Sequence, residues 1–211
     1  MIYLLTLVSD GLEISLLFAD DIVLGSKDIA ALQIALTKWC NVLEDHGLRI
    51  SIPKTEFLCC PFADPTRPAP DIYIKRENLK PCEKFKYLGS MVNREANCDD
   101  DINHRIGVGW MRWRENSGVF CDKKMPRKLK GKLYKTVVRP ALMYASECWT
   151  MYKAYESKIC AAEMKMLRMS AGVTKMDHIK RWRIAVWIGT VMFLGVRLRI
   201  LQKGINAEYS P

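Results

Sequence analysis

Two adjacent aspartates, Asp20 and Asp21, interrupt an apolar stretch at residues 15–26, which read SLLFADDIVLGS. Neighbouring carboxylates repel each other unless a cation neutralises them. Hard divalent ions such as Mg²⁺ bind to one or two carboxylates together with the phosphate oxygens of a substrate. The pair is therefore typical of a phosphoryl-transfer site, in which two metal ions activate the attacking oxygen and stabilise the leaving one. A solvent-exposed turn without a ligand explains the same two residues.

A second candidate for ligand binding is the basic stretch at residues 123–139, which read KKMPRKLKGKLYKTVVR, with eight basic residues and no acidic ones. The whole chain of 211 residues holds 33 Lys and Arg against 23 Asp and Glu, a formal net charge of +10. This charge favours polyanionic partners, with nucleic acid ahead of an acidic membrane surface. A basic surface without a partner is the alternative.

The eight cysteines predict neither a metal site nor a disulfide framework, because no C-x-x-C pair occurs and the three histidines are scattered. The N-terminus lacks the basic segment of a signal peptide, so we expect reduced thiols. The longest apolar stretch, residues 184–196, is shorter than the roughly 20 residues that a membrane-crossing helix needs. We therefore expect no membrane partner.

The elements around the aspartate pair read as a mixture of strands and helices. The apolar runs on either side of the pair predict a hairpin with the carboxylates at its tip. Apolar residues at steps of three and four predict a helix over residues 28–46. Residues 48–60 predict two short strands joined at Pro53, and the three prolines of residues 63–70 predict a loop.

Near residue 95 the pattern changes from strands to helices. Residues 71–75 and 85–93 predict strands, and residues 99–113 and 155–171 predict helices. The basic stretch predicts a helix that begins at Pro126 and presents one strongly cationic face. Its buried seam is expected to consist of three apolar residues: Leu129, Leu133 and Val137.

Along the chain the segments occur in the order LLFADDIVL, helix, GLRISIPKTEFL, proline-rich loop, FKYLGSMV and basic helical region. This order resembles that of the reverse transcriptases of non-LTR, LINE-type retrotransposons. The resemblance runs over about residues 15–178, and the string ECWT adds to it. It implies an α+β fold in three parts. These are a truncated polymerase palm of antiparallel hairpins with a packing helix (1–95), an all-helical thumb-like region (96–180) and a divergent tail (181–211).

The resemblance also implies roles for particular residues. Asp20 would be a catalytic ligand of Mg²⁺, and Asp21 its less directly committed neighbour. Lys54 matches a lysine near the incoming nucleotide, with a solvent-facing turn lysine as the alternative. Tyr87 and Gly89 match a hairpin near the primer terminus, although strand packing explains Tyr87 equally well. Phosphate contacts are expected from the thumb-like helix: Lys128, Lys130, Lys132, Lys135 and Arg139. Three tryptophans that could stack on bases are expected in the core instead: Trp110, Trp113 and Trp149.

The resemblance is incomplete in the residues before Asp20. The family's palm completes its metal site with an aspartate from an earlier strand, and Asp10, which looks helical, is a poor substitute. One carboxylate pair supplies too few ligands for two Mg²⁺ ions. The hairpin would also lack a neighbouring strand, so we expect exposed edges that favour self-association.

Three interpretations follow. The first is a reverse transcriptase-like fragment whose family activity is RNA-directed DNA polymerisation. We expect this fragment to be inactive as an isolated chain. By resemblance, its partners would be an RNA template with a DNA primer, or an RNA–DNA duplex, and it would act in the nucleus. The second is a non-catalytic nucleic-acid-binding module that uses residues 123–139. The third is a non-functional product of a decayed element, without a stable fold.

Overall fold

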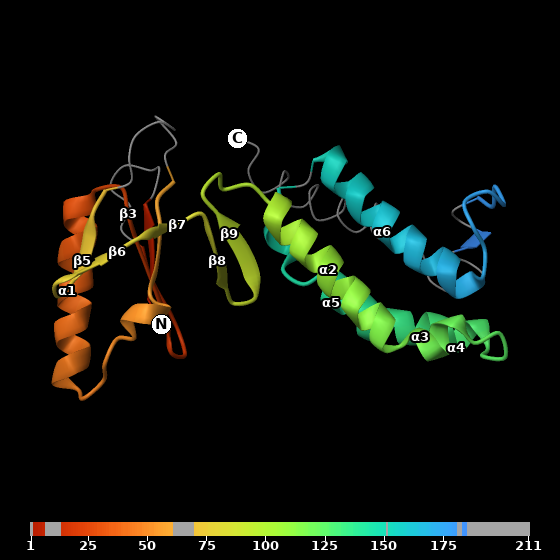
Figure 1. Cartoon of the computed structure of the whole chain (residues 1–211), viewed down its shortest axis with the longest axis horizontal. Coiled ribbons are helices and arrows are strands. Elements are labelled where there is room, and N and C mark those ends of the chain that lie inside the picture. The colour runs from red at the N-terminus through yellow and green to blue at the C-terminus, as the bar shows by residue number, and fades with distance from the viewer. Residues whose placement is uncertain (1, 7–13, 61–69, 151, 181–182, 185–211) are drawn as a thin grey trace, which may run out of the picture. The chain divides into compact units, whose positions relative to one another are not determined.

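The computed structural model describes most of the chain: residues 2–6, 14–60, 70–150, 152–180 and 183–184. Asp10, almost all of the proline-rich loop and almost all of the tail at residues 181–211 lie outside these residues. The chain divides into two compact units, Met1–Asn97 and Cys98–Pro211. Strands dominate the first unit and helices the second, so the predicted α+β class is confirmed (Figure 1). The assignment of the two units as palm and thumb stays a prediction.

The first unit is built on a five-stranded sheet in the order β2-β3-β1-β4-β7. Its strands are β1 (Ile2–Thr6), β2 (Ile14–Phe18), β3 (Asp21–Ser26), β4 (Glu56–Leu58) and β7 (Pro81–Cys82). The predicted hairpin is the antiparallel pair β2–β3. β1 runs parallel to both β3 and β4 and separates them. The expectation that the hairpin lacks a neighbouring strand is therefore wrong for β3, whereas β2 forms an edge of this sheet.

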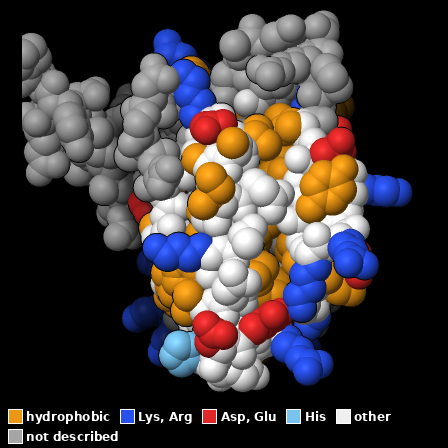
Figure 2. All heavy atoms as spheres, turned by 90° about the vertical axis from the view of Figure 1, so that its left-hand side faces the viewer, with side chains coloured by type: hydrophobic (Ala, Val, Ile, Leu, Met, Phe, Trp, Pro, Cys, Tyr) orange, Lys and Arg blue, Asp and Glu red, His pale blue; other side chains and the backbone are white. Residues whose placement is uncertain are grey.

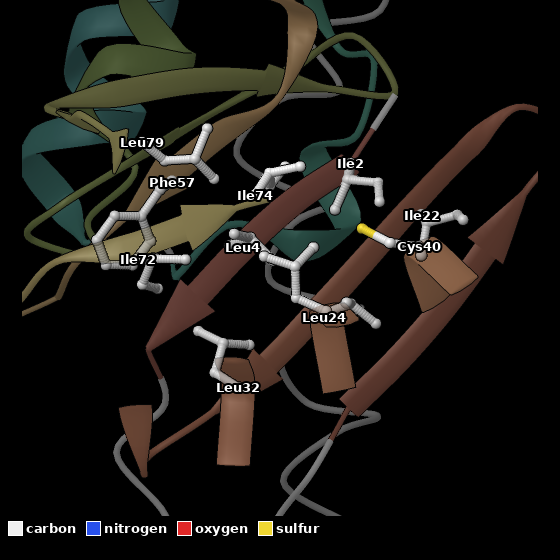
Figure 3. Close-up of a cluster of buried hydrophobic side chains, with 11 residues drawn as sticks. Ile2, Leu4, Ile22, Leu24, Leu32, Cys40, Phe57, Ile72, Ile74 and Leu79 are labelled. Atoms are coloured by element: carbon white, nitrogen blue, oxygen red, sulfur yellow. The ribbon is translucent and has the colours of Figure 1, made fainter. Parts of the chain in front are cut away.

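One face of the sheet is covered by α1 (Ile29–Asp45), which confirms the helix predicted over residues 28–46. The helix begins after Asp28, whose carboxylate accepts a hydrogen bond from the backbone N–H of Ala30 at 3.0 Å. Its buried side packs on alternate residues of the strands (Figure 3). The core on this face includes Ile2, Leu4, Ile22, Leu24, Leu32, Leu36, Cys40 and Phe57. The predicted strand at residues 71–75 is part of a hairpin that adds to this core, β5 (Ile72–Ile74) and β6 (Glu77–Leu79).

The opposite face packs against the hairpin of β8 (Lys84–Tyr87) and β9 (Ser90–Asn93), which confirms the strands predicted over residues 85–93. The ring of Phe85 stacks on that of Tyr3, with the centroids 4.7 Å apart. The strand predicted before Pro53 is wrong. Proline fixes φ and has no N–H to donate, so a single 3₁₀ turn, η1 (Ile52–Lys54), forms there and β4 follows it.

The second unit consists of helices packed around shared apolar clusters. They are α2 (Asp99–Glu115), α3 (Ser117–Cys121), α4 (Arg127–Leu133), α5 (Arg139–Leu142) and α6 (Lys153–Ala171), with short turns at η2 (Tyr134–Val138) and η3 (Ser146–Cys148). The helices predicted at residues 99–113, 155–171 and after Pro126 are confirmed. Among the described helices, none has the length and apolarity that crossing a bilayer requires.

The helix of the basic stretch is interrupted by a wider, π-helical turn at η2, where the N–H of Arg139 donates to the carbonyl of Tyr134. Pro140 explains this turn, because it cannot donate to the carbonyl of Thr136 and its ring crowds that carbonyl. Apart from Gly131, the buried residues of this helix recur at steps of four: Lys130, Tyr134, Val138 and Leu142. The predicted seam of Leu129, Leu133 and Val137 is therefore wrong by one position, and Leu129 is 47% exposed.

Candidate functional site

The aspartate pair lies at the tip of the β2–β3 hairpin, as the sequence predicts. Phe18 pairs with Asp21, so Ala19 and Asp20 form the turn between them. Ala19 has a φ of 51°, in the left-handed region that tight hairpin turns use. Asp20 is exposed and Asp21 is half-buried. A ligand can therefore reach both carboxylates from solvent.

Among the described residues of β1, Tyr3 lies nearest to this turn on the sheet face opposite α1. Its hydroxyl donates to the carbonyl oxygen of Lys86 at 3.0 Å. Burial raises the pKa of Tyr3, and the negative charges of Asp21 and Glu56 raise it further. At neutral pH the described part of β1 therefore presents an uncharged phenol beside Asp21, and not the additional carboxylate that a two-metal site needs.

Lys54 lies at the same end of the sheet as the aspartate pair. It precedes Glu56 by two positions, and Glu56 pairs with Tyr3 on β1. Tyr3 in turn pairs with Val23, two positions after Asp21. Lys54 therefore precedes a strand, β4, that only β1 separates from the Asp21 strand, β3. Lys54 is exposed, and its role near an incoming nucleotide stays a prediction.

The ligands gathered at the hairpin tip are too few for two metal ions. In the described part of the chain, His, Cys, Asp and Glu side chains form no group of three or more that could hold a metal. Asp20 and Asp21 supply one or two carboxylates, which a single Mg²⁺ ion uses together with phosphate oxygens. The residues present therefore fit one ion that arrives with a phosphate-bearing ligand, and they do not fit a two-metal centre.

Tyr87 and Gly89 lie at the tip of the β8–β9 hairpin. Tyr87 pairs with Ser90, and the two residues between them, Leu88 and Gly89, have φ values of 47° and 90°. Glycine adopts such a φ without strain, which explains its place in the turn. The ring of Tyr87 meets the ring of Tyr3 edge-on, with the centroids 5.3 Å apart. Tyr87 thus contributes to sheet packing, and contact of this hairpin with a primer stays a prediction.

Three of the predicted phosphate contacts share one exposed side of the basic helix, which we name the Lys128 face. Lys128, Lys132 and Lys135 are exposed and follow one another at steps of four and three. They line an open pocket of about 810 Å³ together with Leu129. Residues 123–139 contain no acidic side chain that would offset the charge. The Lys128 face therefore offers positive charge next to accessible apolar surface.

Lys130 is the exception, and the structure corrects the role expected for it. The side chain is buried, and its Nζ donates to the carbonyl oxygen of Ser170 at 3.0 Å. Ser170 lies in the last turn of α6, where carbonyl groups lack partners within the helix. The ammonium group of Lys130 therefore stabilises the end of α6 and is not on the surface that phosphates could reach.

Arg139 is half-buried, and its positive charge acts on the buried carboxylate of Glu163. The hydroxyl of Tyr134 donates to Oε1 of Glu163 at 3.1 Å. Burial raises the pKa of Glu163, whereas Arg139 and the hydrogen bond from Tyr134 lower it. Glu163 was not among the residues predicted from the sequence, although its place between Ile159 and Met166 at helical spacing was a signal that it faces the core. Because the charge of Arg139 acts on a carboxyl in the interior of the second unit, a phosphate contact from Arg139 stays a prediction.

The tryptophans lie where core packing was expected. Trp113 and Trp149 are buried, and Trp110 packs against the same cluster as Trp113. The indole N–H of Trp149 donates to Oδ2 of Asp101 at 2.7 Å, and that of Trp113 donates to the hydroxyl of Ser170 at 3.3 Å. The indole N–H groups of Trp113 and Trp149 are therefore committed to the interior of the second unit.

The chain is thus an α+β protein with an exposed carboxylate turn and a basic helix face. In sequence it is similar to two proteins of mobile elements. It is 28% identical over 167 residues to a transposon-derived protein of Caenorhabditis elegans, covering 79% of this chain and 60% of that protein. It is 23% identical over 175 residues to the RNA-directed DNA polymerase from mobile element jockey of Drosophila funebris, covering 78% of this chain and 19% of that protein.

The chain thus spans about three fifths of the first relative and about a fifth of the second. No family model and no solved structure matches it. The two similarities support a retrotransposon-related origin of the chain.

Proposed function

We propose that the chain is a reverse-transcriptase-derived domain that binds nucleic acid through the Lys128 face. The observation that supports this best is the placement of Lys128, Lys132 and Lys135 on one exposed helix side, beside an open pocket. Lysines gain affinity for nucleic acid by releasing the counterions condensed on phosphates, whatever the base sequence. The similarity to an RNA-directed DNA polymerase supports an RNA template with a DNA primer, or an RNA–DNA duplex, as the ligand.

We assign the polymerase chemistry that a retrotransposon-related origin implies to the tip of the β2–β3 hairpin. Asp20 and Asp21 are the proposed ligands of Mg²⁺, which would supply charge neutralisation at a phosphate, and Lys54 is proposed to lie near an incoming nucleotide. The described residues bring too few carboxylates together for two ions, so we expect no primer extension by the chain alone. Binding and catalysis would then be separable, because they use residues of different units.

The binding proposal is tested by measuring affinity for a primed RNA template over a series of salt concentrations. Replacing Lys128, Lys132 and Lys135 by Gln should weaken binding uniformly across sequences. It should also reduce the slope of log affinity against log salt by about 0.7 to 0.9 for each lysine. The control removes the same charge from exposed lysines elsewhere: Lys80, Lys153 and Lys175. An equal loss of affinity in both triple variants would refute a localised binding face.

Catalysis is tested separately by primer extension on the same template with Mg²⁺. We expect no extension by the wild-type chain and unchanged binding by Asp20→Ala. Extension that disappears in Asp20→Ala would show that the metal site is completed, and it would overturn the separation of binding from catalysis.

A further inference from the structure

Among the described strands, β2 forms one edge of the five-stranded sheet. In the described part of the first unit it pairs with β3 on one side, and no strand lies on the other. Its sequence, ISLLF, contains no charge and no proline, which are the usual means of blocking edge-to-edge pairing. Three of its side chains are at least half exposed: Leu16 (50%), Leu17 (58%) and Phe18 (60%). This edge can therefore accept another strand.

An apolar groove runs beside this edge, on the side of the sheet that α1 covers. Ser15 pairs with Leu24 on β3, whose side chain packs under α1, so Ser15 points to the same side. Next to Ser15 the groove is open, with a volume of about 490 Å³, and α1 lines it with Ile34, Lys38, Trp39 and Val42. Figure 2, in which the α1 side faces the viewer, shows hydrophobic side chains open to solvent on this face. The small side chain of Ser15 leaves room for a larger one.

We propose that a second copy of this chain pairs with β2, strand against strand and antiparallel, with Leu16 opposite Leu16. In this register Leu17 of each copy lies opposite Ser15 of the other. Directly opposed residues of antiparallel strands point to the same face of the sheet. Leu17 of each copy therefore enters the groove of the other beside Ser15, while Phe18 meets Ile14 on the opposite face.

The charges at the two ends of β2 favour a second copy as the occupant. Asp20 and Asp21 follow the C-terminal end of β2. Lys38 lines the groove beside Ser15, near the N-terminal end of β2. Antiparallel pairing directs the acidic end of each copy toward the lysine-bearing end of the other. The two-fold arrangement uses both β2 edges at once, so it closes as a dimer and does not extend into a fibre.

The test is sedimentation velocity of the full chain at increasing concentration. We expect a dimer, and we expect Leu17→Lys to raise its dissociation constant at least about tenfold by placing a charge at the edge. Ser15→Leu should also weaken the dimer, without any charge, because the new side chain occupies the groove. The control, Leu48→Lys, changes another exposed leucine of the first unit, which is 58% exposed, and should dimerise as the wild type does. Circular dichroism checks that all variants fold.

A cross-link tests the register. With exposed Cys121 and Cys148 replaced by Ser, Leu16→Cys should form a disulfide between copies when diamide takes up the two thiol hydrogens, and Leu48→Cys should not. A wild-type chain that stays monomeric at about 100 µM, well above the micromolar range of weak specific complexes, would overturn the proposal. A dimer that Leu17→Lys and Ser15→Leu leave unchanged, or one without the Leu16→Cys cross-link, would overturn it equally.

Discussion

The ammonium nitrogen of Lys130 lies 3.0 Å from the carbonyl oxygen of Ser170, which joins the basic helix to the C-terminal turn of α6. A lysine that donates to an otherwise unpartnered carbonyl at a helix end stabilises that end through the hydrogen bond and through its charge. Within one basic stretch, then, neighbouring lysines have different tasks: Lys130 holds two helices together, and the Lys128 face remains exposed.

Lys130→Met should therefore lower the free energy of unfolding by about 1.5–3 kcal/mol, the usual range for a lost hydrogen bond of a charged group. It should leave the salt dependence of nucleic-acid binding unchanged. Lys132→Met is the matched control, with stability within about 0.5 kcal/mol of the wild type and weaker binding. Thermal unfolding and binding curves measure both effects. If the two variants exchanged these phenotypes, the assignment of structural and binding lysines would be wrong.

Glu163 should make stability depend on pH. Burial raises the pKa of Glu163 in the folded chain above the ordinary value of a glutamate side chain. A carboxyl with a raised folded pKa contributes stability that is fully present below the unfolded pKa and is lost as pH rises through the folded pKa. Glu163→Gln cannot titrate, so its stability relative to the wild type should increase with pH across that window. Urea unfolding between about pH 4 and pH 8 measures this. An advantage that shrinks with pH would mean that the charge of Arg139 outweighs burial.

Gly89→Ala should destabilise the first unit by about 1–2 kcal/mol, because an alanine side chain at a φ of 90° meets the backbone. Gly107→Ala provides the opposite control. Gly107 lies inside α2, and beyond the neighbouring helix backbone no atom lies within 4 Å of an added Cβ. Alanine there should therefore stabilise the helix by about 0.5–1 kcal/mol. Denaturant midpoints compare the two variants. A stabilising Gly89→Ala would be incompatible with the turn described at this hairpin.

Trp149→Phe should cost more stability than Trp113→Phe. Both rings are buried, but the indole of Trp149 donates to a buried carboxylate, Asp101, at 2.7 Å. The indole of Trp113 donates to a neutral hydroxyl at 3.3 Å. We expect losses of about 1.5–3 kcal/mol for Trp149→Phe and about 0.5–1.5 kcal/mol for Trp113→Phe. Equal losses in chemical denaturation would indicate that ring packing, and not the hydrogen bond, accounts for both.

The elements with a clear local signal could be predicted from the sequence. The helix after Asp28 has a capping residue and regular apolar spacing, and the carboxylate hairpin has an apolar run on each side. β1 had no such signal, because its place depends on parallel pairing with β3 and β4, which come later in the chain. Local periodicity does not contain that long-range pairing.

The site was predictable to a similar extent. The positions of the carboxylates and of three surface lysines followed from charge and turn pattern, whereas the burial of Lys130 and the exposure of Leu129 did not. Both depend on which side of the basic helix meets α6. That choice was set by contacts of Tyr134 and Ser170 with other helices, which residue type alone does not reveal.

The wide turn at η2 is the place where the basic helix can lose a residue without turning its later part away from the core. In a regular α-helix a step of four residues passes a full turn by about 40°, so a buried side repeating every four residues would wind around the helix. The π-helical turn holds one residue more than a regular turn and takes up part of this rotation. Loss of one exposed residue there, such as Thr136, would give regular helical spacing while Lys130 and Leu142 kept facing the core. Loss of a residue elsewhere in this helix would rotate everything after it by about 100°. Natural variants of this helix that differ in length are therefore expected to differ at η2.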